Sequence, residues 1–144
     1  YEGELSDERP VICANPALDA IAGHYALQAR QAQTPVTWQL SLPELLPLPE
    51  EEFCMMLGNL LENALRATGA LPPEQRRIRV SAQMLSPVML GLIVENSYDA
   101  RPGAVPAGEG IGLTSVETVV RKYSGQMTVE REDGLFRINI LLNL

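Results

Sequence analysis

The chain has 144 residues, a length typical of one domain with a real hydrophobic core. Eleven Lys and Arg against eighteen Asp and Glu give a formal net charge of −7. An acidic chain without a run of basic residues argues against a protein that binds nucleic acid or a membrane surface. Any phosphate group that binds would need a local cradle, because the overall charge repels anions.

Two cysteines, Cys13 and Cys54, show neither the spacing of a metal site nor that of a redox pair. We expect each to be a small buried apolar residue in a reducing compartment. No apolar run is long enough to cross a bilayer, and no signal peptide is evident. Because the first residue is Tyr1, we expect residues 1–144 to be a single domain of a longer protein.

The N-terminal part of the sequence predicts a helix followed by a strand. Asn15 is a good N-cap and Pro16 suits the first helical position, so apolar residues at helical spacing predict a helix over about 16–31. The alternating, β-rich segment 34–42 predicts a strand. The proline-rich segment 43–50 then predicts a loop.

A second helix is predicted over 51–67, "EEFCMMLGNLLENALRA". Its apolar residues recur at helical spacing and predict one buried stripe that faces a core. This stripe consists of Phe53, Leu57, Leu60, Leu61 and Ala64.

Two strands and a long loop follow. The segments 77–85 and 88–96 are β-rich and are joined by a tight turn at Ser86 and Pro87. The segment 97–110, "SYDARPGAVPAGEG", has no periodicity and is rich in Gly, Pro and Ala. A loop of this length in a compact domain is usually functional or mobile.

The C-terminal part predicts a helix and a hairpin. Segment 111–125 has helical spacing and ends at Gly125, which we expect to be the C-cap. Segments 126–132 and 135–144 flank Asp133–Gly134, a strong hairpin-turn signal. The second of these strands alternates Phe136, Ile138, Ile140 and Leu142.

The predicted order is helix, strand, helix, two strands, helix, two strands. Such an order favours an α/β fold in which a mixed sheet carries its helices on one face. We therefore expect a two-layer α/β sandwich.

The second helix also carries an unusual polar stripe. Asn59, Glu62, Asn63 and Arg66 lie at positions i, i+3, i+4 and i+7. An ordinary solvated face with a Glu62–Arg66 pair remains possible, but such a face favours Lys, Glu and Gln over the poor helix former Asn. An amide oxygen is a neutral, hard ligand that suits Mg²⁺, and an arginine one turn away can neutralise a phosphate.

Three alternating glycines, Gly108, Gly110 and Gly112, precede the third helix. Glycine permits close backbone approach, and a helix start offers free N–H groups to an anion. The segment therefore fits a phosphate-binding site, although an ordinary loop would also explain it. It lacks the Lys-Ser/Thr of a Walker A motif and the preceding strand of a Rossmann fingerprint.

Taken together, "GNLLENALRA" and "GEGIGL" resemble the N box and the second glycine box of the GHKL ATPase superfamily. Within it, the chain looks most like the catalytic ATP-binding domain of sensor histidine kinases of the quorum-sensing peptide-receptor type. The resemblance covers essentially the whole chain. It implies the Bergerat (GHKL) fold, a two-layer α/β sandwich, with ATP and Mg²⁺ as cofactors.

The resemblance also implies roles for individual residues. Asn63 would be the Mg²⁺ ligand and Asn59 its companion, both catalytic and ATP-binding, and Arg66 would contact phosphate. The segment from Ser97 to Ala107 would form the ATP lid. The remaining ATP-binding positions at the lid and the helix start would be Gly108, Gly110, Gly112, Leu113 and Thr114.

One departure concerns the first glycine box. In the family an Asp that binds the adenine amino group is followed two residues later by a Gly, whereas this chain has Asn96 and Tyr98 there. Asn96 keeps a carbonyl acceptor but loses the charge. Tyr98 would stack on the base, fill the pocket, or simply pack at the end of the strand.

The single histidine, His24, lies on the first predicted helix without an acidic residue directly after it. We interpret it as a structural or surface residue. The phospho-acceptor histidine of a histidine kinase is then expected in another part of the protein.

The function implied by the resemblance is that of a protein histidine kinase in a two-component system. The domain would donate the γ-phosphate of ATP to a histidine on a separate dimerisation domain of the same or a partner chain, for transfer to a response regulator. We expect a cytoplasmic domain of a membrane-bound, homodimeric receptor in the inner or plasma membrane, with no nucleic-acid partner. The alternatives are a degenerate, non-catalytic interaction module and an anti-sigma serine kinase or other GHKL ATPase.

Overall fold

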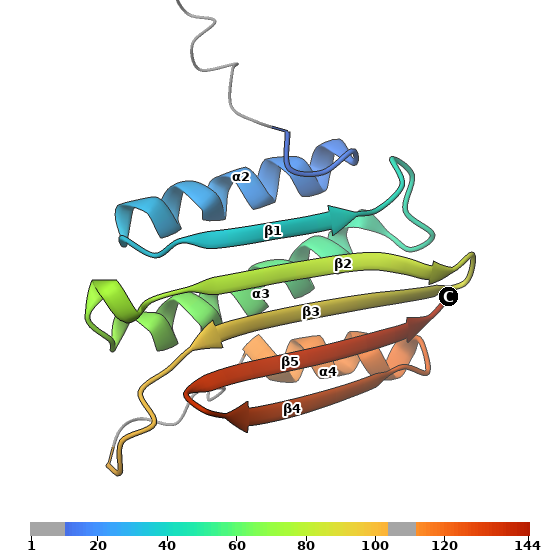
Figure 1. The fold of residues 1–144 in the computed structure, drawn as a ribbon. Helices are drawn as coiled ribbons and strands as arrows, with labels where there is room; N and C mark the ends of the chain where they lie inside the picture. The colour runs from blue at the N-terminus through green and yellow to red at the C-terminus, as the bar shows by residue number, and fades with distance from the viewer. Residues whose placement is uncertain (1–10, 104–111) are drawn as a thin grey trace, which may run out of the picture.

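The computed structural model describes residues 11–103 and 112–144 (Figure 1). The predicted glycines Gly108 and Gly110 lie outside these ranges. In chain order the elements are α2 (Pro16–Gln31), β1 (Val36–Ser41), α3 (Glu50–Gly69), the short 3₁₀ helix η1 (Pro73–Gln75), β2 (Ile78–Ser86), β3 (Met89–Ser97), α4 (Gly112–Lys122), β4 (Gln126–Glu132) and β5 (Leu135–Asn143).

The strands form one five-stranded sheet in the order β1-β2-β3-β5-β4. β1 pairs with β2 in parallel, and the other neighbours pair antiparallel. A parallel pair needs a crossover connection, and α3 provides it. The helices cover one face of the sheet (Figure 1). The predicted two-layer sandwich with a mixed sheet is confirmed.

The core lies between the sheet and α3. All five residues of the predicted apolar stripe of α3 are buried, as are the alternating residues of β5. Phe53 and Phe136 are completely buried and lie in the same hydrophobic cluster. The pleat directs every second residue of a strand to the same face, so the β5 pattern indicates the core side of the sheet.

The start of α2 fixes the N-terminal helix against the rest of the domain. The Asn15 side chain accepts a hydrogen bond from the backbone N–H of Leu18, as predicted for an N-cap. Its amide nitrogen donates to the carbonyl oxygen of Glu44 and to the carboxylate of Glu50, both at 2.7 Å. Both the oxygen and the nitrogen of the buried Asn15 side chain therefore have hydrogen-bond partners. Through these bonds Asn15 also links α2 to the start of α3.

Two local predictions are wrong. Ser97 is not part of the loop: it is the buried last residue of β3, and its hydroxyl accepts a hydrogen bond from the backbone N–H of Arg77. Gly125 is not the left-handed residue after α4, because Ser124 takes that conformation with φ 49°. Gly125 is needed for a different reason: a Cβ there would lie 2.1 Å from the carbonyl oxygen of Leu141.

The two cysteines differ in burial, and Cys13 is the one that is buried as predicted. Cys13 is buried and Cys54 is half-buried, and both are free thiols. Burial, together with Glu50 and Glu51, raises the pKa of Cys54, so its reactive thiolate form is disfavoured. Over the described ranges, no helix combines the length and the hydropathy that spanning a bilayer requires.

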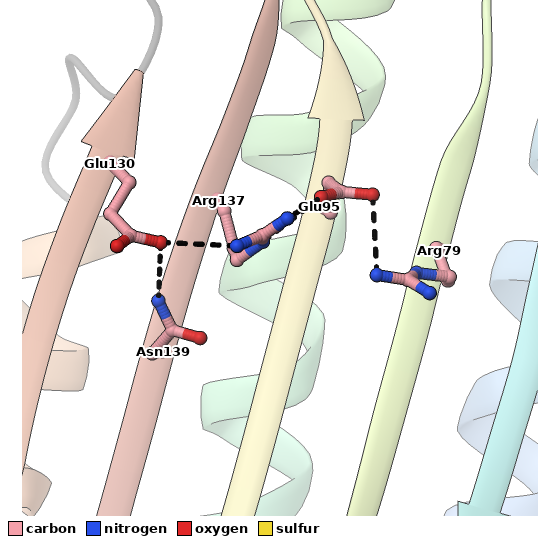
Figure 2. A network of polar contacts seen from close by, with 5 residues as sticks. All are labelled: Arg79, Glu95, Glu130, Arg137 and Asn139. Carbon is pink, nitrogen blue, oxygen red and sulfur yellow. Dashed lines mark hydrogen bonds and ion pairs between the residues drawn. The ribbon is translucent and has the colours of Figure 1, made fainter. Parts of the chain in front are cut away.

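A charged network crosses the face of the sheet that the helices leave open (Figure 2). Glu95 on β3 accepts two hydrogen bonds from Arg137 on β5, at 2.6 and 2.9 Å, and forms an ion pair with Arg79 on β2 at 3.5 Å. Arg137 also contacts Glu130 on β4. The network therefore joins four neighbouring strands, and Glu95 is its least exposed carboxylate at 12%.

We expect Glu95→Gln to lower the free energy of unfolding by about 1 kcal/mol, because two arginines lose the charge that they share. Glu130→Gln is the matched control, since Glu130 is 57% exposed and meets one arginine. Its expected effect is close to zero. Urea unfolding of both variants measures the difference. Equal effects would show that the network does not depend on Glu95.

Candidate functional site

A small pocket lies between α3 and the start of α4, with a volume of about 50 Å³. The described residues that line it are Asn59, Glu62, Asn63, Arg66, Gly112 and Leu113. The polar stripe predicted on α3 therefore meets the last of the three predicted glycines, although more than forty residues separate them in the sequence. These contacts explain why asparagine occupies this helix face, which borders a pocket as well as solvent.

Asn63 carries the most informative polar group of the pocket. The residue is 5% exposed, and its Oδ1 accepts a hydrogen bond from Arg66 at 3.3 Å. Its Nδ2 is buried and has no hydrogen-bond partner among the described residues. A buried amide nitrogen without a partner costs stability, so this group is expected to serve a ligand or an ordered water.

Asn59 lies against the N-terminus of α4. Its Nδ2 contacts the carbonyl oxygen of Gly112 at 3.3 Å and the sulfur of Met55 at 3.1 Å. A Cβ on Gly112 would lie 3.2 Å from the Cβ of Asn59, closer than side chains normally approach. Glycine at this position lets the helix start rest on the asparagine, which brings the first backbone N–H groups of α4 close to the pocket.

Glu62 completes the polar stripe, and a tyrosine of α2 holds it. The hydroxyl of Tyr25 donates to Glu62 Oε2 at 2.7 Å. Burial of the tyrosine, followed by the contact with Glu62, raises the pKa of Tyr25 to about 12. The phenol therefore remains protonated, and a hydrogen-bond donor, throughout the neutral range.

The other end of α4 is fixed to the start of α3. The carboxylate of Glu52 accepts hydrogen bonds from Lys122 and Tyr123 at the C-terminus of α4. These hydrogen bonds lower the pKa of Glu52. Glu52 thus joins the start of α3 to the end of α4, and none of these three residues lines the pocket.

Several predicted site residues lie outside this pocket. Asn96 is buried at the end of β3, where its Nδ2 donates to the carbonyl oxygen of Ser97. The Tyr98 ring packs edge-on against Phe136, with ring centroids 6.5 Å apart, which favours the strand-end packing role. Thr114 is exposed on α4 and does not line the pocket. His24 is exposed on α2, as expected of a surface residue.

The described pocket fits the phosphate end of a nucleotide with its metal. Two amide side chains, a carboxylate, an arginine and a helix start supply hard oxygen donors and groups that bind anions. No cluster of three or more His, Cys, Asp or Glu that could hold a metal occurs in the described ranges. Mg²⁺ binds few protein oxygens directly and keeps several of its waters. It therefore suits such a donor set better than a transition metal does.

The pocket is much smaller than a complete nucleotide site, since ligand pockets usually measure roughly 300–1,000 Å³. The rest of a nucleotide would have to lie outside this pocket. Residues 104–111 lie outside the ranges that the structure describes. They include the predicted positions Gly108 and Gly110 and the lid residues after Gly103.

Tyr25 is the pocket-related residue that sequence reasoning missed. Helical spacing assigns it to the apolar face of α2, and its burial agrees with that. The available signal was its hydroxyl, because a buried phenol usually has a hydrogen-bond partner. The spacing along α2 alone cannot show that this partner lies on α3.

The chain is similar to a known protein family, to a known sequence and to solved structures. The sequence model of the GHKL domain family matches residues 50–143. A probable C4-dicarboxylate sensor kinase of Bacillus subtilis (strain 168) is 27% identical over 97 residues, which cover 59% of this chain. The match spans only 18% of that relative's length.

Solved structures with the same fold include histidine kinases. The mycobacterial sensor histidine kinase MprB superposes with a TM-score of 0.63 at 18% identity, covering 88% of this chain and 93% of that one. Full-length ShkA in complex with AMPPNP gives a TM-score of 0.61 at 21% identity, covering 88% of this chain and 29% of that one. At these identities the likeness establishes the fold.

Proposed function

Since this chain belongs to the GHKL domain family, we propose that it is the ATP-binding catalytic domain of a sensor histidine kinase. In this proposal the domain binds Mg²⁺-ATP and donates the γ-phosphate to a histidine on a separate dimerisation domain. A response regulator would then receive the phosphate. The finer expectation of a quorum-sensing receptor remains a prediction.

One observation carries the proposal: Asn59, Asn63, Arg66 and Gly112 line a single pocket. The family match and the fold point to nucleotide binding, and the pocket supplies the chemistry for it. The buried Nδ2 of Asn63, which has no hydrogen-bond partner among the described residues, is a further support, because such a group calls for a ligand or an ordered water.

The proposed mechanism depends on position and charge. Phosphoryl transfer requires mainly orientation and neutralisation of the phosphate oxygens, which Mg²⁺ supplies when it is bound. Asn63 would hold the metal through its amide oxygen, with Asn59 beside it at the phosphate end. Arg66 would contact a phosphate oxygen, and the first N–H groups of α4 would donate to the same charged group.

The geometry favours a phosphate donor over a fast ATPase. Among the described pocket residues, Glu62 is the one that could accept a proton from water; the others are two amides, an arginine, a glycine and a leucine. We therefore expect the isolated domain to hydrolyse ATP negligibly. Brisk hydrolysis by the domain alone would favour the alternative of another GHKL ATPase.

A calorimetric titration with ADP and AMPPNP, in Mg²⁺ and again in EDTA, tests the proposal. We expect saturable binding that weakens when Mg²⁺ is removed. The alternative is a degenerate GHKL module that only docks partners, which the packing of Tyr98 on Phe136 favours. That alternative predicts no saturable heat under either condition.

A further inference from the structure

The contact between α2 and α3 is close at one point. The Tyr25 ring, only 7% exposed, lies over Gly58 on α3. A Cβ on Gly58 would lie 3.3 Å from the Tyr25 hydroxyl and 3.6 Å from its Cε2 atom. Glycine therefore gives the ring its place on the surface of α3.

From that place the tyrosine reaches the next turn of α3. Glu62 is four residues after Gly58, and its Oε2 accepts the phenolic hydrogen bond at 2.7 Å. Since one helical turn advances about 5.4 Å, a ring that lies over Gly58 can reach Glu62 with its hydroxyl. The ring and its hydroxyl thus contact two consecutive turns of the helix that carries the pocket.

The carboxylate held in this way belongs to the pocket. Glu62 lies between Asn59 and Asn63 in the sequence and lines the pocket with them. A glutamate on an exposed helix face normally samples several rotamers. The hydrogen bond from a buried, rigid phenol restricts that freedom and leaves the second oxygen, Oε1, for the pocket.

We propose that Tyr25 is a positioning residue for the metal: it holds the Glu62 carboxylate beside the pocket, where the carboxylate accepts hydrogen bonds from the water molecules of Mg²⁺. The inference rests on the proposed function. Mg²⁺ keeps most of its waters, and acceptors in its outer shell orient them. A negative charge held at this place attracts the cation and repels the phosphates, so it aids binding only when Mg²⁺ is present. Its effect should therefore appear in the Mg²⁺ dependence of binding.

Tyr25→Phe tests the inference, because it removes the hydroxyl and keeps the ring over Gly58. ADP affinity is measured at a series of free Mg²⁺ concentrations and in EDTA, together with the thermal midpoint. We expect the Mg²⁺ concentration for half-maximal affinity to rise about 10-fold, the lower end of outer-shell effects on metal sites. Affinity in EDTA and the thermal midpoint should change little.

Two further variants make the test specific. Glu62→Gln should shift the Mg²⁺ requirement at least as far, because it removes the charge, and adding Tyr25→Phe to it should change little, since no carboxylate is left to position. Tyr123→Phe is the matched control, because it removes another tyrosine–glutamate hydrogen bond to α3, at Glu52. It should leave the Mg²⁺ requirement unchanged.

Three results would overturn the inference. They are an unchanged Mg²⁺ requirement in Tyr25→Phe, an equal loss of affinity with and without Mg²⁺, and an equal shift in Tyr123→Phe. In each case the unmutated domain still binds ADP, so the proposed function stands. Failure of the unmutated domain to bind ADP would overturn the proposed function and this inference with it.

Discussion

Replacing Asn63 with alanine is expected to weaken Mg²⁺-dependent nucleotide binding by at least about 100-fold, the scale set by losing a metal-ligand bond rather than an outer-shell contact. The reason is that Asn63 supplies the amide oxygen proposed to hold the metal. Asn63→Asp should fail as well, because it loses the Nδ2 donor and places a second negative charge beside Glu62 and the phosphates. Calorimetric titration with ADP in Mg²⁺ measures both effects.

The stability of Asn63→Ala distinguishes a binding role of Asn63 from a structural one. The buried Nδ2 has no partner among the described residues, and alanine is the better helix former. Asn63→Ala should therefore unfold cooperatively, with a free energy within about 1 kcal/mol of the unmutated domain. If the role of Asn63 were structural, its truncation to alanine would lower the free energy of unfolding of the domain by more than this.

Asn139→Ala is the matched control for Asn63→Ala. Asn139 lies on the open face of the sheet, where its amide contacts Glu130 at 3.2 Å (Figure 2). The same atoms are removed at a place remote from the pocket, so ADP affinity should be unchanged. Unchanged affinity in Asn63→Ala as well would remove the metal role of Asn63.

Gly125→Ala is expected to lower the free energy of unfolding by about 3 kcal/mol, at the upper end for a side chain forced into filled space. Its Cβ would lie 2.1 Å from the carbonyl oxygen of Leu141 and 3.3 Å from the Cα of Leu142. The three atoms nearest to it belong to the backbone of β5, which cannot rotate away as a side chain can. β5 pairs with β3 on one side and β4 on the other, so a shift disturbs both ladders.

Gly69→Ala is the control for this substitution. Gly69 is the last residue of α3, and a Cβ there meets nothing within 4 Å among the described residues. Alanine should leave stability within about 1 kcal/mol of the unmutated domain, or raise it, because it suits a helix better than glycine. Urea unfolding compares the two variants. Equal midpoints would show that β5 accommodates the added methyl group.

The regular elements were largely predictable because local signals determine them. Asn15 and Pro16 locate the start of α2, and the predicted bounds 16–31 agree with the structure. The Asp133–Gly134 turn also forms as predicted, with positive φ at both residues. Alternation in β5 correctly identified its buried face.

Long-range packing accounts for what the sequence did not reveal. Gly125 follows a helix and so resembles a C-cap, but its requirement comes from Leu141, sixteen residues later. Ser97 continues β3 because its backbone N–H reaches the carbonyl oxygen of Arg77. Nothing in the local composition of either segment encodes these contacts.

The candidate site could also be predicted only in part from the sequence. The spacing of Asn59 and Asn63 on one helix predicted a shared polar face, and the structure brings that face together with Gly112 and Leu113. The hydroxyl of Tyr25 reaches this face from another helix, which periodicity along α2 cannot indicate. The roles of Gly108 and Gly110 remain predictions, because both residues lie outside the described ranges.

The central claim is that the amides of α3 and the glycine-rich start of α4 together hold a metal-bound triphosphate. A crystal structure of the domain grown with Mg²⁺ and AMPPNP tests it most directly. We predict Mg²⁺ bound to the amide oxygen of Asn63, with phosphate oxygens between Arg66 and the N-terminus of α4. A nucleotide bound elsewhere on the domain, with Asn63 making no contact to the metal, would contradict the account.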